Sequence, residues 1–411
     1  MERPRIRKTF PTNSPPGSAK PFYLQDPFRL TDTPLELSER ELELARMMTG
    51  EYTGSELREA YRKRFQEEIL PEDIEAFTRR LDDHLILENE KFRRAYESAQ
   101  EAFREEAVRP MGHMGEGYPE DPAEFRKALE AWLALPAGPG PATFPREAPR
   151  TPAVFAPHID IPLAGHAYAH AYKPACEDPA NELFVCLCTA HYRDVNPFIL
   201  TGKDFETPFG TVETDRAFVA DLHKAFGADL FEDELIQKVE HSVEFQAVFL
   251  DAMLRGRRPF RIVPVLVSSF AGMVEPHARP ADNPLISDFL AALDETLAPR
   301  REKTCVVAGV DLAHVGRKFG DGFDPDAGTL KDLETADRKS LARACALDAD
   351  GFWDDVMADG NARKICGLAP VYVALKVLKD ARGEVKAYGS DFRPDENYVV
   401  TFAGVVFHPS F

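Results

Sequence analysis

Short apolar runs alternate with helical patterns through the C-terminal two thirds of this chain of 411 residues. The apolar runs cover residues 153–157, 183–189, 260–267, 304–310 and 398–407. The helical patterns lie between them, at residues 165–172, 215–226, 232–254, 284–297, 330–346 and 369–379. Buried strands separated by helices are typical of an α/β protein, because the connecting helices cover both faces of the sheet. The pattern therefore predicts an α/β domain over residues 104–411.

The N-terminal quarter has a different character. Residues 1–27 contain several prolines and serines without periodicity, which predicts a flexible tail. Ser38 and Glu41 form a capping box before one helical pattern, and further patterns begin at Ser55 and Pro71. An extended stretch at residues 85–87 follows them. Three short helices with a β-like tail predict a small all-α, winged-helix-like domain over residues 28–103.

The charge of the chain bears on which partners it can have. Its formal net charge is −19, and residues 38–83 carry 8 basic and 13 acidic side chains, a net of 8 − 13 = −5. Binding to nucleic acid needs a basic surface, so we expect no nucleic-acid partner despite a local basic patch at residues 62–64. No apolar run reaches 18 residues, which predicts no membrane span, and the polar N-terminus indicates a cytoplasmic protein.

Polar side chains follow three of the predicted strands. His158 follows the first apolar run, His191 follows the second, and Asp311 with His314 follows the run at residues 304–310. Ligands of open α/β sheets bind at the carboxyl ends of the strands, so these side chains are expected to converge. Imidazoles with a carboxylate are ligands for iron, zinc or copper.

Two further segments carry candidate site residues. Cys366 precedes a glycine and a predicted helix start, where the helix N-terminus and basic neighbours are expected to lower the pKa of a thiol. Cys366 is therefore a candidate soft ligand or nucleophile. Glu240, His241 and Glu244 share one helical segment that lacks the second histidine of a zincin motif. The two acids either orient a metal-bound imidazole from the second shell or form a solvent-exposed acidic face.

The ordered set of these segments resembles the Memo family, which includes the bacterial AmmeMemoRadiSam system protein B. The segments that carry the resemblance lie at residues 108–122, 156–168, 189–191, 205–210, 240–246, 311–316 and 365–367. Together they span about residues 104 to 411. The resemblance implies a core like that of the class III extradiol dioxygenases, preceded here by the additional winged-helix-like domain.

The resemblance also implies roles for the candidate residues. His158, His191 and Cys366 would be the metal ligands, His314 would match the acid–base position, and Asp311 would lie close to the metal. Glu240, His241 and Glu244 would support the ligands from the second shell. The glutamate ligand of the ring-cleaving enzymes has no counterpart, and a cysteine ligand shifts the expected metal toward Fe(II) or Cu(I).

Two functions compete at this stage. The first is a non-haem metal-dependent oxidoreductase that activates O2 or moves an electron, acting on an unidentified small molecule or peptide. The second is a non-catalytic metal carrier or adaptor that uses the winged-helix-like domain to recruit a peptide or protein. The family name implies a radical-SAM protein and an AMMECR-like protein as partners. A hydrolase using Cys366 with His314 is a third option, but no oxyanion motif accompanies it.

Overall fold

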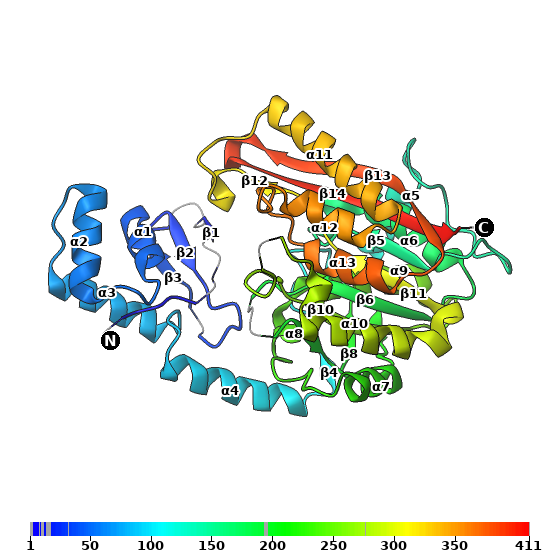
Figure 1. The fold of residues 1–411 in the computed structure, drawn as a ribbon, viewed down its shortest axis with the longest axis horizontal. Helices are drawn as coiled ribbons and strands as arrows, with labels where there is room; N and C mark the ends of the chain where they lie inside the picture. The colour runs from blue at the N-terminus through cyan, green and yellow to red at the C-terminus, as the bar shows by residue number, and fades with distance from the viewer. Residues whose placement is uncertain are drawn as a thin grey trace. The chain divides into compact units, whose positions relative to one another are not determined.

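The chain forms two compact units, Met1–Glu106 and Ala107–Phe411. A computed structural model describes residues 3–7, 9, 12–13, 18–31, 33–192, 196–275 and 277–410 (Figure 1). The boundary falls after the end of helix α4 (Glu90–Glu105), a few residues beyond the boundary expected at 103.

The first unit combines helices with a small sheet. Its helices are α1 (Glu39–Met47), α2 (Gly54–Phe65), α3 (Pro71–Asp83) and α4. Capping boxes of Ser38 with Glu41 and of Thr53 with Glu56 begin α1 and α2, as the first of these was predicted to do. The strands β1 (Thr12–Asn13), β2 (Phe22–Leu24) and β3 (Leu35–Leu37) form a three-stranded antiparallel sheet, so the unit is not all-α. Strands of two or three residues are too short to produce a periodic sequence signal.

The described residues of the expected tail also belong to the first unit. Arg7 donates a hydrogen bond from Nη2 to Asp26 at 2.6 Å, and both side chains are buried. Single β-bridges join Arg5 to Thr49 and Ile6 to Leu87. The two bridges join residues that are 44 and 81 positions apart in the chain, so local sequence pattern gives no sign of them.

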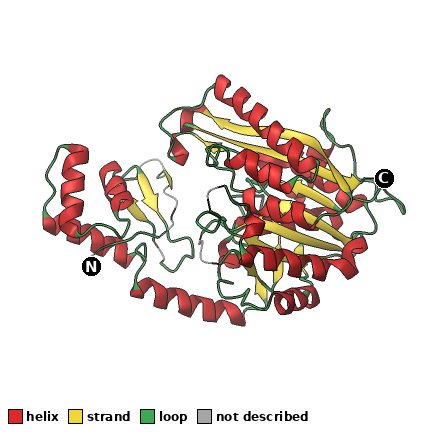
Figure 2. Ribbon diagram, viewed as in Figure 1, coloured by secondary structure: helices red, strands yellow, loops and turns green. Residues whose placement is uncertain are grey.

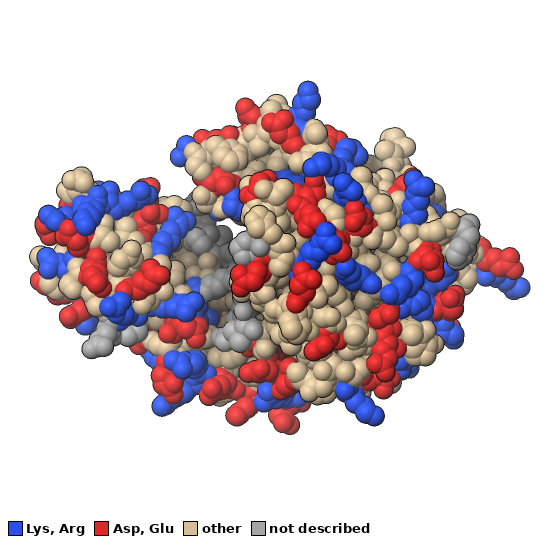
Figure 3. Space-filling model, viewed as in Figure 1, with Lys and Arg blue, Asp and Glu red and all other residues tan. Residues whose placement is uncertain are grey.

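The basic patch at residues 62–64 lies on α2 beside acidic side chains. Arg62 and Lys63 pair with Glu59, and Arg64 pairs with Glu43. On the face drawn in Figure 3, basic and acidic side chains are interspersed over this unit. The patch is thus a solvated, charge-balanced helix face.

The second unit is built on an eight-stranded sheet. Its strand order is β12-β14-β5-β11-β6-β10-β7, and β13 pairs with β14. The four strands β5, β11, β6 and β10 are parallel to one another, and the outer strands pair in antiparallel fashion. The strands are β5 (Ala153–Ala156), β6 (Leu183–Thr189), β7 (Phe198–Leu200), β10 (Arg261–Val267), β11 (Thr304–Gly309), β12 (His314–Val315), β13 (Ala381–Arg393) and β14 (Tyr398–Pro409).

Helices cover both faces of this sheet, as the sequence predicted (Figure 2). One face is covered by α5 (Pro122–Leu133), α6 (Ile161–Glu177) and α9 (His241–Leu254). The other is covered by α7 (Arg216–Phe226), α10 (Pro284–Leu297), α11 (Ala327–Cys345), α12 (Ala349–Met357) and α13 (Leu368–Val377). Successive residues of β14 point to opposite faces of the sheet. Gly404 faces α6, while Ala403 and Val405 belong to the hydrophobic core on the other face.

The remaining elements are short. A separate three-stranded sheet contains β4 (Val108–Arg109), β8 (Asp204–Thr207) and β9 (Gly210–Val212), and helix α8 (Ile236–Val239) precedes α9. Among the described residues, none of the helices has the length and apolar character needed to span a bilayer.

The parallel strands end level with one another. Gly309 of β11 pairs with both Ala156 of β5 and Cys188 of β6. The segments that follow β5, β6 and β11 therefore leave the sheet at one edge, as expected for a parallel sheet, and bring His158, His191 and Asp311 together.

Candidate metal centre

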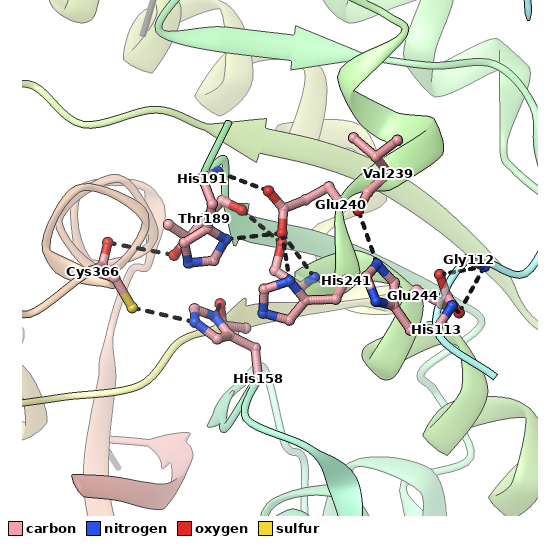
Figure 4. A network of polar contacts seen from close by, with 12 residues as sticks. Gly112, His113, His158, Thr189, His191, Val239, Glu240, His241, Glu244 and Cys366 are labelled. Carbon is pink, nitrogen blue, oxygen red and sulfur yellow. Dashed lines mark hydrogen bonds and ion pairs between the residues drawn. The ribbon is translucent and has the colours of Figure 1, made fainter. Parts of the chain in front are cut away.

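Three histidines from separate elements meet at this edge of the sheet (Figure 4). His158 follows β5, His191 follows β6, and His241 is the first residue of α9. One nitrogen atom of each ring lies within 4.8 Å of the others. The rings of His191 and His241 are stacked with centroids 4.8 Å apart, and the ring of His158 meets both edge-on. The arrangement can hold one metal ion.

His241 has a different place from the one predicted. The sequence placed it in the second shell, whereas its ring is part of the three-histidine cluster. The expected helix over residues 232–254 is interrupted at Glu240, whose backbone is extended with φ −81° and ψ 127°. Glu240 caps α9 by accepting a hydrogen bond from the backbone N–H of Ser242. The break places His241 at the helix start, where its ring faces the strand ends.

Glu240 contacts two rings of the cluster at once. Its Oε1 atom accepts from Nδ1 of His191 at 2.9 Å and lies 3.1 Å from Nδ1 of His241. The carboxylate is almost fully buried. Burial alone would raise the pKa of Glu240, but the two imidazoles hold that pKa well below its usual range. The carboxylate therefore stays ionised and fixes the proton of each ring on Nδ1, which leaves each Nε2 for a metal.

His158 is the buried member of the cluster, and backbone contacts fix its tautomer. Its Nδ1 lies 2.9 Å from the carbonyl oxygen of Gly309, so Nδ1 carries the proton and Nε2 is unprotonated. Burial holds the pKa of His158 well below its ordinary value, which keeps the ring neutral. Its backbone N–H donates to Oδ1 of Asp311 at 3.0 Å. The unprotonated Nε2 atom accepts a hydrogen bond from Cys366 Sγ at 3.2 Å and lies 3.5 Å from Asp311 Oδ2.

Cys366 lies beside His158, and the pKa of its thiol is not lowered in the way predicted. Burial, together with the charge of Asp311, raises the pKa of Cys366 above its ordinary value. The basic neighbours are turned to other partners, since Lys364 pairs with Asp321 and Arg363 pairs with Asp337. A neutral thiol becomes a thiolate ligand only when a metal ion replaces its proton.

Asp311 and His314 lie near the cluster on the segment after β11. Burial raises the pKa of Asp311 to about 6 and lowers the pKa of His314 to about 4. His314 donates from Nδ1 to the carbonyl oxygen of Leu312 at 3.0 Å, so its Nε2 atom is unprotonated. His314 is not one of the three clustered histidines.

Glu244, which was predicted to support a metal-bound imidazole, contacts the loop that precedes α5. It is fully buried, which excludes the solvent-exposed acidic face. Among the described residues its hydrogen bonds come from Arg109, from Tyr118 Oη at 2.5 Å and from the backbone N–H groups of Gly112 and His113. Glu244 therefore fastens the loop at residues 109–118 to α9.

His113 was missed by sequence reasoning. Its ring lies edge-on to that of His241, with centroids 5.5 Å apart, and its Nε2 lies 2.9 Å from the carbonyl oxygen of Val239. The position of its ring depends on the hydrogen bond of its backbone N–H to Glu244, which is 131 residues away. A lone histidine in a turn-rich segment gave no signal of that contact.

Fold and site together define an α/β protein with a candidate three-histidine metal centre. The family model described as Memo-like protein matches residues 109–406, and the chain belongs to this family. A MEMO1 family protein of Aquifex aeolicus is 26% identical over 392 residues, which cover 94% of this chain and 96% of that protein. A MEMO1 family protein of Methanopyrus kandleri is 30% identical over 302 residues, covering 71% of this chain and 96% of that protein. A MEMO1 family protein of Thermus thermophilus is 28% identical over 342 residues, which cover 82% of this chain and 94% of that protein.

Proposed function

We propose that the chain binds one redox-active metal ion, Fe(II) or Cu(I), with His158, His191, His241 and Cys366, and acts as a non-haem oxidoreductase. The observation that carries the proposal is the convergence of three imidazole nitrogens within 4.8 Å, with Cys366 Sγ 3.2 Å from His158 Nε2.

The donor set fits these metals. Three imidazoles suit iron, copper or zinc, and a thiolate adds a soft ligand that favours Cu(I) or thiolate-bound iron. The hydrogen bonds at the Nδ1 atoms of His158 and His191 leave both Nε2 atoms free to bind. His158 is buried, whereas the side chains of His191 and His241 are about one fifth to one quarter exposed, so the cluster is open to solvent on one side. A small substrate or O2 can reach it from that side.

When bound, the metal would supply one-electron and O2 chemistry. Glu240 orients two of the ligands, and Asp311 orients His158 through its backbone N–H. His314 and Asp311 are the groups available to move protons, because each has a proton-binding atom free on the segment that borders the cluster. The class III extradiol dioxygenases would be relatives of this core.

A non-catalytic carrier or adaptor is the second candidate, and the domain organisation favours it. The Aquifex match covers 94% of this chain, whereas the Methanopyrus match covers 96% of that protein with only 71% of this chain. The family model matches residues 109–406, so the first unit lies outside the matched part. In this reading it is a winged-helix-like module that docks a peptide or protein, for which a radical-SAM protein and an AMMECR-like protein are the proposed partners.

Metal content and O2 uptake test the proposal together. The full chain, purified without a metal-binding tag and loaded anaerobically with Fe(II) or Cu(I), is expected to retain about one ion per chain. His158→Ala should lose it, while the control His170→Ala should not, because His170 lies on α6 with its ring against the carbonyl oxygen of Ala137. With ascorbate as electron donor, the loaded chain is expected to consume O2, and His314→Ala should keep the metal but lose the uptake. Retained metal without O2 uptake in any form would favour the carrier, and equal metal content in His158→Ala would contradict both.

A further inference from the structure

A buried carboxylate outside the candidate metal centre connects three segments of the second unit. Asp337 lies on α11 and is fully buried. Its Oδ1 atom accepts from Nη1 of Arg363 at 2.6 Å, and its Oδ2 atom accepts from Thr401 at 2.6 Å and from Tyr388 Oη at 2.9 Å. Burying a carboxylate is costly unless it is paired and hydrogen-bonded, and these three donors meet that need. Two of the three donors also contact segments that carry site residues.

Arg363 connects Asp337 to the segment that carries Cys366. It lies three residues before Cys366 and also donates from Nη2 to Ser340 Oγ at 2.8 Å. Its carbonyl oxygen accepts the backbone N–H of His314 at 2.8 Å. The turn at residues 361–364 that contains Arg363 is demanding, because Asn361 and Lys364 have positive φ angles of 58° and 52°. The guanidinium therefore holds a strained turn in place.

Thr401 connects the same carboxylate to the segment that carries Asp311 and His314. Its hydroxyl donates to Asp337 and accepts the backbone N–H of Ala313 at 2.9 Å. Its backbone N–H donates to the carbonyl oxygen of Ala313 at 3.0 Å, and its own carbonyl oxygen accepts the N–H of Leu312 at 2.8 Å. Because a hydroxyl has one proton, the bond to Asp337 sets the direction in which the oxygen accepts from Ala313.

We propose that Asp337 is a positioning residue that fixes the Cys366 turn and the His314 segment relative to His158, acting through Arg363 and Thr401. The inference rests on the proposed function, because the two segments that Asp337 holds carry the proposed thiol ligand, Cys366, and the proposed acid–base residue, His314. None of the side chains that make these contacts is a proposed metal ligand, so the positioning can be tested separately from metal binding.

Alkylation of the metal-free full chain tests the positioning directly. With iodoacetamide and peptide mapping, Asp337→Asn is expected to raise the alkylation rate of Cys366 at least tenfold, because the turn no longer holds Sγ against His158. Cys345 is the internal control, since it is the last residue of α11 and is also partly exposed. An unchanged rate at Cys366, or equal increases at Cys366 and Cys345, would overturn the proposal, the second by showing that α11 has simply loosened.

Two further variants cover the case in which Asp337→Asn fails to fold. Thr401→Val keeps the shape of the side chain but removes the hydroxyl, and it should also raise the Cys366 rate; Thr401→Ser should keep the wild-type rate. Asp350→Asn is the matched control, because Asp350 pairs with Lys376 on the neighbouring helices α12 and α13 and has no contact with Arg363. A wild-type rate in Thr401→Val would overturn the proposal.

Cobalt(II) distinguishes this inference from the proposed function. The Asp337→Asn chain should still bind one Co(II) through the imidazoles but lose at least half of the thiolate-to-metal absorption. Full absorption in this variant would overturn the positioning role. If the wild-type chain binds no Co(II), the metal proposal fails, and the alkylation rates alone decide the role of Asp337.

Discussion

The carboxylate of Glu240 contacts His191 twice. Its Oε1 atom lies 2.9 Å from Nδ1 of the His191 ring, and its Oε2 atom accepts the backbone N–H of His191 at 2.7 Å. The double contact fixes both the position of the residue and the orientation of its ring. Since the same Oε1 atom also faces Nδ1 of His241, one buried carboxylate prepares two of the three imidazoles.

This relationship predicts the effect of Glu240→Gln. An amide is neutral and has a single oxygen, so it cannot accept from the rings and from the His191 backbone N–H at the same time. The metal affinity should therefore fall by roughly 10- to 100-fold, as is typical when a group that orients a metal ligand is lost. Competition with a chelator of known affinity measures the change. Glu213→Gln is the control, because Glu213 is exposed and pairs with Arg261. Equal affinities in the two variants would contradict the role given to Glu240.

The close packing of Gly367 predicts a second effect. A Cβ atom at this position would lie 2.5 Å from Cβ of Val310 and 3.0 Å from the carbonyl oxygen of Asp311. Gly367→Ala should therefore destabilise the second unit by about 1–3 kcal/mol and displace Cys366. Urea unfolding measures the loss, and Gly322→Ala is the control because a Cβ there meets nothing within 4 Å. Equal stability of the two variants would contradict this prediction, because it would mean that the residues after β11 move to make room for the added methyl group without any loss of stability.

The ion pair of Arg109 and Glu244 predicts a larger effect. Both side chains are fully buried, so removing one leaves the other charge uncompensated. Glu244→Gln should cost about 3–5 kcal/mol of stability. A double-mutant cycle with Arg109→Met measures the coupling between the two side chains by urea unfolding. Additive losses would contradict a direct interaction.

The capping box of α1 predicts a pH dependence for the first unit. Burial alone would raise the pKa of Glu41, but hydrogen bonds from Lys20, Ser38 and Arg80 lower it to about 2. A lowered pKa in the folded state contributes stability above pH 4.5 that is lost as the pH falls toward 2. At neutral pH, Glu41→Gln should cost about 1 kcal/mol, since the side chain is partly exposed and the pairs are screened. Thermal unfolding at several pH values should show the difference shrinking as the pH approaches 2, and a constant difference would contradict this origin.

The sequence predicted the parts of the fold that local pattern encodes. Apolar runs at residues 183–189 and 304–310 correspond to β6 and β11, and the parallel order follows from the helices between them. The convergence of His158, His191 and Asp311 could be predicted for the same reason, because parallel strands end at one edge.

The rest depends on contacts between residues that are distant in the chain. The carboxylates Glu240 and Glu244 lie one helical turn apart and are the same residue type, yet Glu240 supports the histidines and Glu244 anchors a loop. The helix break at Glu240 decides this difference, and nothing in the helical pattern of residues 232–254 reveals it. Similarly, the raised pKa of Cys366 follows from the burial of its thiol and the nearby charge of Asp311, which the fold provides and the local sequence does not show.

Anomalous diffraction from crystals of the metal-loaded full chain tests the central claim most directly. Data collected on both sides of the iron or copper absorption edge should give one strong peak bound by His158, His191, His241 and Cys366, at about 2.0–2.4 Å from the nitrogen and sulfur atoms. The Cys366→Ser chain should keep the peak with one ligand fewer. A loaded crystal with no peak among these residues, or with its strongest peak elsewhere in the chain, would contradict the claim that this cluster is the metal centre.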